Sequence, residues 1–143
     1  MTDIKEKQEE IAAYAASPLG DTRTVEEIAV GEFARQGDVY LLRVESVPAG
    51  AKPCADRQLA PGTTQGSRHT VTDEVDVYRP QGFGTVERLG TRENVAARSV
   101  GHVLESKERF TVSHPEHADI SLPAGTYQVY HQVDCRTLER VRD

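Results

Sequence analysis

Two histidines separated by two residues form the most chemically suggestive pattern in the sequence. His114 and His117 flank Pro115 and Glu116 in the segment "SHPEHAD". The fixed φ of Pro115 suits the first position of a helical turn, and a single turn would bring the imidazoles at i and i+3 to the same side. Two imidazoles can bind one ion, but a zinc site needs three or four ligands. A third ligand must therefore come from elsewhere in the chain.

His69 is the best distant candidate for that ligand, because it ends a segment rich in Gly, Ser and Thr, and Glu116 or Asp119 can add a carboxylate. Imidazole and carboxylate donors suit Zn, Mn, Fe or Ni. We therefore predict a divalent-metal site, such as a zinc site, with ligands from His69, His114, His117 and Glu116. The alternative interpretation is a solvated turn between two strands, and the spacing alone is compatible with both.

The other histidines and the cysteines show no such pattern. His131 shares the alternating face of the segment "TYQVYHQV" with apolar residues, which indicates a hydrogen-bonded core histidine. His102 has no partner at ligand spacing and is interpreted as a structural or surface residue. Cys54 and Cys135 could in principle pair, but a cytosolic chain of this size usually keeps its cysteines reduced, so both are interpreted as packing or incidental residues. The sequence also contains no nucleotide-binding or serine-hydrolase motif.

The composition is typical of one folded domain. The chain has 143 residues, of which 37% are apolar and 28% are charged. A formal net charge of -6, without a run of Lys and Arg, disfavours nucleic-acid binding. No segment approaches the roughly 20 apolar residues of a membrane span, and the N-terminus lacks the apolar segment of a signal peptide. We therefore expect a cytoplasmic protein that does not bind membranes.

The elements that would position these residues are mainly strands. In the segment 37–47, Tyr40, Leu42 and Val44 alternate with charged residues, as in a half-buried strand. Residues 48–67 are rich in Pro, Gly, Ser and Thr, which predicts a long loop. Further strands are expected at 68–73, 74–79, 84–89, 94–106, 108–112, 119–122 and 126–135. Many short strands predict a mainly β protein, a compact antiparallel barrel or sandwich of jelly-roll type.

The N-terminal part shows helix signals instead. Asp3 and Glu6 resemble a capping box that would start a first helix. Thr24 and Glu27 form a second such signal, which predicts a short helix through Ala29. The sequence thus predicts an N-terminal helical appendage at 1–34 and a β-rich domain at 35–143.

Three segments resemble a family of small, uncharacterised β-rich proteins of bacteria and their phages. They are "RQGDVYLLRVESVP" (35–48), "GTTQGSRHTV" (62–71) and "HPEHADISLPAGTYQVYHQ" (114–132), and the resemblance covers about the last hundred residues. The family's first motif is Gly-His-x-His, of which this chain keeps Gly66 and His69. Its second is a His-x-Glu-His turn before Ile, Leu-Pro, Gly and Tyr, which is intact here. The resemblance implies a polar or metal-binding cluster of His69, His114 and His117, with Ser67 in place of one ligand.

The resemblance and the composition together favour a non-catalytic function. We predict a soluble β-rich accessory or protein-binding module of phage or mobile-element type, in a bacterial or phage-infected cell. It would act with a protein partner or as a homo-oligomer, and its histidine cluster would hold a divalent metal. Two alternatives remain open. One is a small metal-dependent, cupin-like enzyme with Glu116 as general base and the loop at 51–68 as a lid. The other is a structural or virion-associated oligomer.

Overall fold

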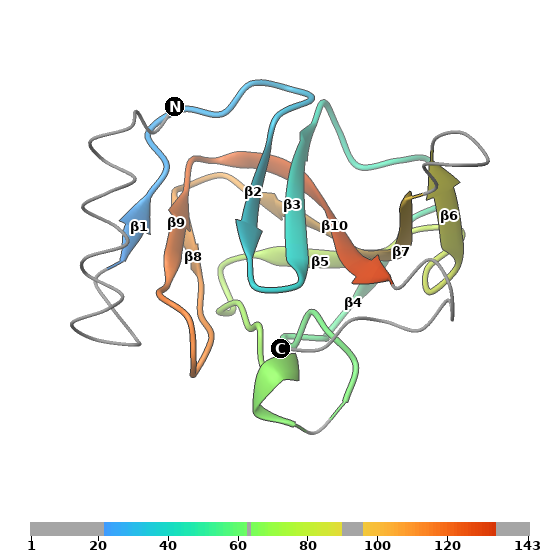
Figure 1. Cartoon of the computed structure of the whole chain (residues 1–143). Helices are drawn as coiled ribbons and strands as arrows, with labels where there is room; N and C mark the ends of the chain where they lie inside the picture. The colour runs from blue at the N-terminus through green and yellow to red at the C-terminus, as the bar shows by residue number, and fades with distance from the viewer. Residues whose placement is uncertain (1–21, 63, 90–95, 134–143) are drawn as a thin grey trace.

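A computed structural model describes residues 22–62, 64–89 and 96–133 (Figure 1). The first predicted helix, within residues 1–21, and Cys135 lie outside these ranges. The strands are β1 (Arg23–Thr24), β2 (Phe33–Gln36), β3 (Val39–Val44), β4 (Lys52–Cys54), β5 (Asp76–Arg79), β6 (Val86–Leu89), β7 (Ala96–Ser106), β8 (Phe110–Val112), β9 (Ile120–Leu122) and β10 (Gly125–Val133). One 3-10 turn, η1, spans Gln65–Ser67. The predicted mainly β fold is confirmed.

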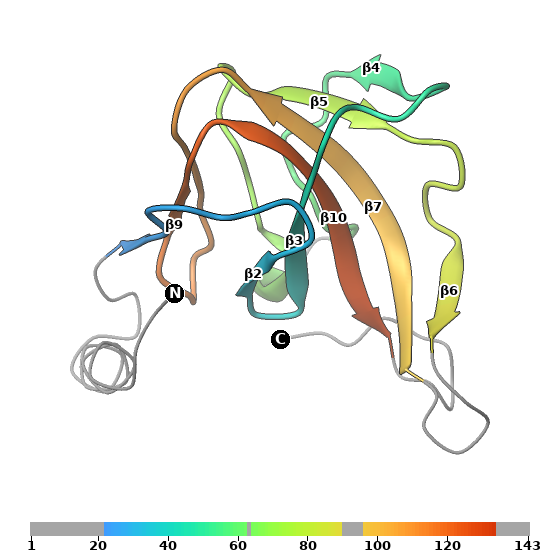
Figure 2. The same ribbon diagram turned by 90° about the horizontal axis from the view of Figure 1, so that it is seen from above.

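The larger sheet is built on the two longest strands, β7 and β10. Its order is β2-β3-β10-β7-β5-β4, its pairs are antiparallel, and β6 also pairs with β7. Figure 2 shows β7 and β10 curving together along the length of this sheet. One edge of β7 pairs with β10, while the other is shared by β6 at residues 96–99 and β5 at residues 103–105. In the described residues β2 and β4 end this sheet and do not pair with each other, so it stays open and the predicted barrel is wrong.

The smaller sheet has the order β1-β9-β8 and includes a parallel pair. Arg23 donates its backbone N–H to Asp119 O at 2.8 Å, and Val25 donates to Ser121 O at 2.9 Å. These bonds hold residues 23–25 in an extended conformation, so the helix predicted from Thr24 to Ala29 is wrong. Residues 22–34 add one strand to each sheet, and the domain division at residue 35 remains a prediction.

The core lies between the two sheets. Val39 and Leu41 of β3 are fully buried, whereas Tyr40 and Leu42 on the opposite face are half-buried. Phe110 of β8 meets Tyr127 of β10 edge to face, with ring centroids 5.4 Å apart, and this contact joins the sheets. In the described ranges no helix has the length and apolar character needed to cross a membrane.

The predicted strand segments from residue 74 onward match β5 to β10, except that β10 begins one residue earlier than predicted, at Gly125. The segment 68–73 does not form a strand and contributes two isolated bridges, both at Thr70, to Gln58 and to Ser113. The segment 48–67, predicted as a loop, contains β4 and η1. These two differences concern the part of the chain that carries Cys54, Asp56 and His69.

Tyr127 makes stability depend on pH in the alkaline range. It is fully buried, and burial raises its pKa above the usual 10.0. Above pH 10 the unfolded chain loses this proton first, so the free energy of unfolding should fall as pH rises. Replacing Tyr127 by Phe should reduce that fall, although Tyr130, whose pKa burial also raises, should retain part of it.

Urea unfolding at pH 8 and pH 10.5 measures this effect. At pH 8 the variant should lose about 1 kcal/mol, because the Tyr127 hydroxyl donates a hydrogen bond to Pro123 O at 2.7 Å. An unchanged pH dependence in Tyr127→Phe would contradict the prediction.

Candidate functional site

The three histidines singled out by the sequence lie in a row. The ring centroids of His69 and His114 are 4.3 Å apart, and those of His114 and His117 are 4.6 Å apart. They meet because the backbones of Thr70 and Ser113 form a bridge, with N–H to O distances of 2.9 and 3.0 Å. That bridge brings the residue before Thr70 beside the residue after Ser113.

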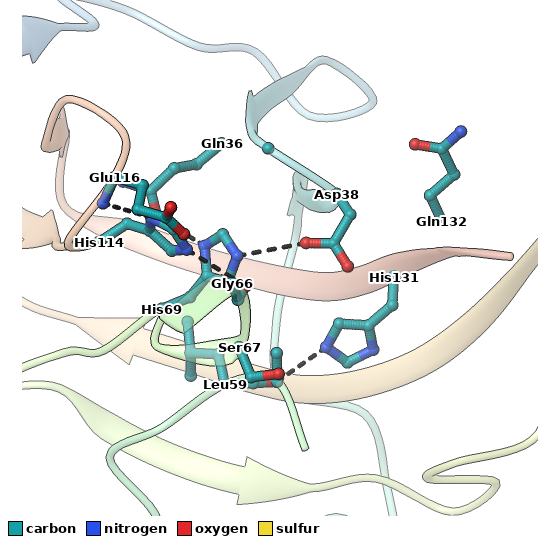
Figure 3. Close-up of polar contacts among 12 residues, drawn as sticks. Gln36, Asp38, Leu59, Gly66, Ser67, His69, His114, Glu116, His131 and Gln132 are labelled. Carbon is teal, nitrogen blue, oxygen red and sulfur yellow. Dashed lines mark hydrogen bonds and ion pairs between the residues drawn. The ribbon is translucent and has the colours of Figure 1, made fainter. Parts of the chain in front are cut away.

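A glutamine fixes the orientation of the His69 ring (Figure 3). Gln36 donates from its Nε2 to Val112 O at 3.1 Å and to Ala118 O at 3.0 Å. Its Oε1 therefore accepts a hydrogen bond from the Nδ1–H of His69 at 2.8 Å. On the other side of the ring, Nε2 lies 3.3 Å from Asp38 Oδ1, and both side chains are fully buried.

His114 and His131 also use both ring nitrogens. His114 donates from Nε2 to Gly66 O at 3.1 Å and accepts the backbone N–H of Glu116 on Nδ1 at 3.0 Å. His131 donates from Nε2 to Leu59 O at 2.8 Å, and its Nδ1 lies 3.2 Å from Ser99 Oγ. The prediction of a hydrogen-bonded core histidine at position 131 is confirmed.

These hydrogen bonds already use ring nitrogens that the predicted metal site would need. An ion bound to His69 or His114 would have to replace one of the hydrogen bonds described above. Glu116 takes part through its backbone N–H, and its side chain is exposed. Metal binding by His69, His114, His117 and Glu116 remains a prediction.

A second cluster combines a cysteine, a carboxylate and a histidine. Cys54 ends β4, Asp56 follows it, and His102 lies in β7. One ligand atom of each side chain lies within 4.8 Å of the other two, and the described residues contain one such group. Asp56 Oδ2 accepts hydrogen bonds from His102 Nε2 at 2.8 Å and from Arg79 Nε and Nη2 at 3.0 and 2.7 Å. The bonds from His102, and then those from Arg79, lower the pKa of Asp56.

The strand pairing explains how this cluster forms. Cys54 pairs with Val77 of β5, and Val77 pairs with Leu104 of β7. This arrangement carries the end of β4 across β5 toward His102. The sequence did not predict this cluster, because Cys54 was interpreted as incidental and His102 has no partner at ligand spacing in the sequence.

His102 is the most unusual group in the cluster. Its side chain is 5% exposed, and its buried Nδ1 has no hydrogen-bond partner within the described part of the chain. The ring of Phe83 lies against it, with centroids 4.7 Å apart, and the guanidinium carbon of Arg79 lies 4.9 Å from the Phe83 centroid. A buried nitrogen without a partner is unfavourable unless something else binds it.

The histidine row predicts a stability defect for loss of Gln36. A Gln36→Leu substitution leaves two carbonyls and the His69 N–H buried without their partner. We expect a loss of roughly 3 kcal/mol or more in the free energy of unfolding, since each such group costs about 1 to 3 kcal/mol. Gln132→Leu is the matched control, because Gln132 is partly exposed and its side chain accepts from Arg35. Equal losses in the two variants, measured by urea unfolding, would contradict the role of Gln36.

Both clusters lie in the part of the chain that matches a protein-family model. No curated protein and no solved structure matches the chain. A family model described as a domain of unknown function, DUF8820, matches residues 35–132. The match includes every residue of the histidine row and of the Cys54, Asp56 and His102 cluster, and it agrees with the predicted resemblance to an uncharacterised family. Since the model covers more than half of the sequence, the chain belongs to the DUF8820 family.

Proposed function

We propose that the protein binds one divalent metal ion of the zinc class through Cys54, Asp56 and His102. The observation that carries this proposal is that Cys54, Asp56 and His102 each bring one potential ligand atom within 4.8 Å of the other two. His102 would bind the ion through Nε2, because this nitrogen faces Asp56 Oδ2 at 2.8 Å. The ion would take the place of the proton between these two atoms.

The donor set supports zinc over harder cations. Thiolate, imidazole and carboxylate are the three donor types of protein zinc sites, whereas Mg and Ca prefer oxygen donors alone. Ligands at about 2.0 to 2.3 Å from one ion lie roughly 3 to 4 Å apart. The three ligand atoms lie within 4.8 Å of one another, so small side-chain rotations would close the site.

The histidine row is the competing location for the ion. It has more imidazoles, but both nitrogens of His69 and His114 already make hydrogen bonds. Binding there would cost at least one of those bonds, whereas at the second cluster the bond between His102 Nε2 and Asp56 would be replaced by bonds from both side chains to the same ion. The proposed ion is therefore still of the zinc class, as the sequence predicted, but its ligands are Cys54, Asp56 and His102.

Elemental analysis of untagged protein, purified without chelator, tests both locations. We expect near-stoichiometric zinc in the wild type and in a His114→Ala/His117→Ala variant. Cys54→Ser and His102→Gln should bind zinc at least tenfold more weakly, because each lacks one of the three ligands. Circular dichroism establishes that each variant is folded. A wild type without metal, or a loss of metal confined to the His114/His117 variant, would contradict the proposal.

A second candidate function is protein binding through the β2 edge. In the described residues β2 pairs with β3 alone, and Phe33 on this strand is 58% exposed. Val30, just before the strand, is 53% exposed. Edge strands offer unpaired backbone groups to another chain, and large exposed apolar side chains strengthen such contacts. We propose that two copies of the chain associate at this edge, in line with the predicted homo-oligomer.

Sedimentation velocity over a concentration series tests this association. The wild type should form dimers as concentration rises, and Phe33→Ser should stay monomeric because the apolar contact is lost. Val86→Ser is the control, since Val86 is also exposed but lies on β6, away from β2. A wild type that is monomeric throughout would contradict self-association.

A further inference from the structure

An exposed arginine lies beside the proposed metal ligands. Arg79 directs Nε and Nη2 to Asp56 Oδ2, and its side chain is 53% exposed. Its pKa is raised, chiefly by Asp56 and to a smaller extent by Cys54, so both acidic groups lie near the guanidinium. Arg79 is therefore hydrogen-bonded to Asp56 of the cluster and also accessible to solvent.

Metal binding would change the charge of this cluster. Without an ion, the negative Asp56 and the positive Arg79 balance. A bound divalent ion takes Cys54 as a thiolate, because metal ligation by cysteine requires the deprotonated form. The two positive charges of the ion then offset Cys54 and Asp56, and the charge of Arg79 remains. The loaded site therefore carries one net positive charge that the metal-free site lacks.

The ion would also offer a binding position. Zinc is usually four-coordinate, and three protein ligands leave the fourth position to water or to another ligand. An anion placed there would neutralise the site. The planar guanidinium of Arg79 matches the two oxygens of a carboxylate. The ring of Phe83, which is 37% exposed, provides an apolar surface next to the guanidinium.

We propose that the metal-loaded protein binds a small organic carboxylate, which occupies the ion's fourth position and pairs with Arg79. This inference rests on the proposed metal function and names a ligand class for that site. The two ligands are coupled: the carboxylate binds the loaded site more tightly than the metal-free site, and by linkage it strengthens metal binding by the same factor.

Cobalt-loaded protein titrated with acetate tests the inference, because the visible absorption of Co²⁺ reports its ligands. Sodium chloride at equal ionic strength controls for salt effects. We expect a saturable change with acetate in the wild type. In Arg79→Gln the half-saturating acetate concentration should rise roughly tenfold or more, since a charge-assisted pair is lost. Lys52→Gln is the matched control: it removes the same charge from an exposed residue that pairs with Arg79 across β4 and β5.

The outcomes separate the two proposals. A wild type that does not bind Co²⁺ or zinc would overturn the metal function, and the carboxylate inference with it. A wild type that binds Co²⁺ but shows no spectral change with acetate would overturn the carboxylate inference alone. Equal half-saturating concentrations in the wild type and Arg79→Gln would remove Arg79 from the site. Acetate binding of equal strength to metal-free protein, measured by calorimetry, would overturn the coupling.

Discussion

The side-chain amide of Gln36 connects the two sheets, the β2–β3 turn and the buried histidines. It extends from the edge of the larger sheet to the carbonyl of Val112 in β8 and to that of Ala118 before β9. Both amide hydrogens are used there, so its oxygen is left for His69. Because leaving any of these buried groups unpaired is costly, the positions of the turn, the smaller sheet and the His69 ring depend on one another.

The hydrogen-bond partners of the ring nitrogens separate the histidines into two kinds. His69, His114 and His131 have partners on both ring nitrogens and tie separate segments together, as His131 does with Leu59. His102 has one nitrogen on Asp56 and a buried second nitrogen without such a bond among the described residues. Spacing in the sequence drew attention to His114 and His117, whereas the cluster of His102 with Cys54 and Asp56 depends on strand pairing.

The sequence predicted those features that depend on neighbouring residues. Alternating side chains and turn residues identified the segments that become β5 to β10, and the H-x-x-H spacing identified part of the histidine row. Features that depend on distant pairing were missed. The capping signal at Thr24 gives way to a strand because Arg23 and Val25 bond to the chain around β9. The larger sheet stays open because its end strands, β2 and β4, do not pair with each other in the described residues, which no local pattern reveals.

The sequence predicted neither strand β4 nor the cluster of Cys54, Asp56 and His102, and both omissions have the same physical cause. Pro, Gly and small residues at 48–67 favour a loop, and β4 is a three-residue edge strand that pairs with β5. Cys54 and Asp56 lie at its end, so they come near His102 only when β4 pairs with β5 and β5 pairs with β7. An ion bound by all three would therefore link the edge strand to the centre of the sheet. Since an ion that bound only the folded arrangement would stabilise it by mass action, the proposed metal binding would be coupled to the formation of β4.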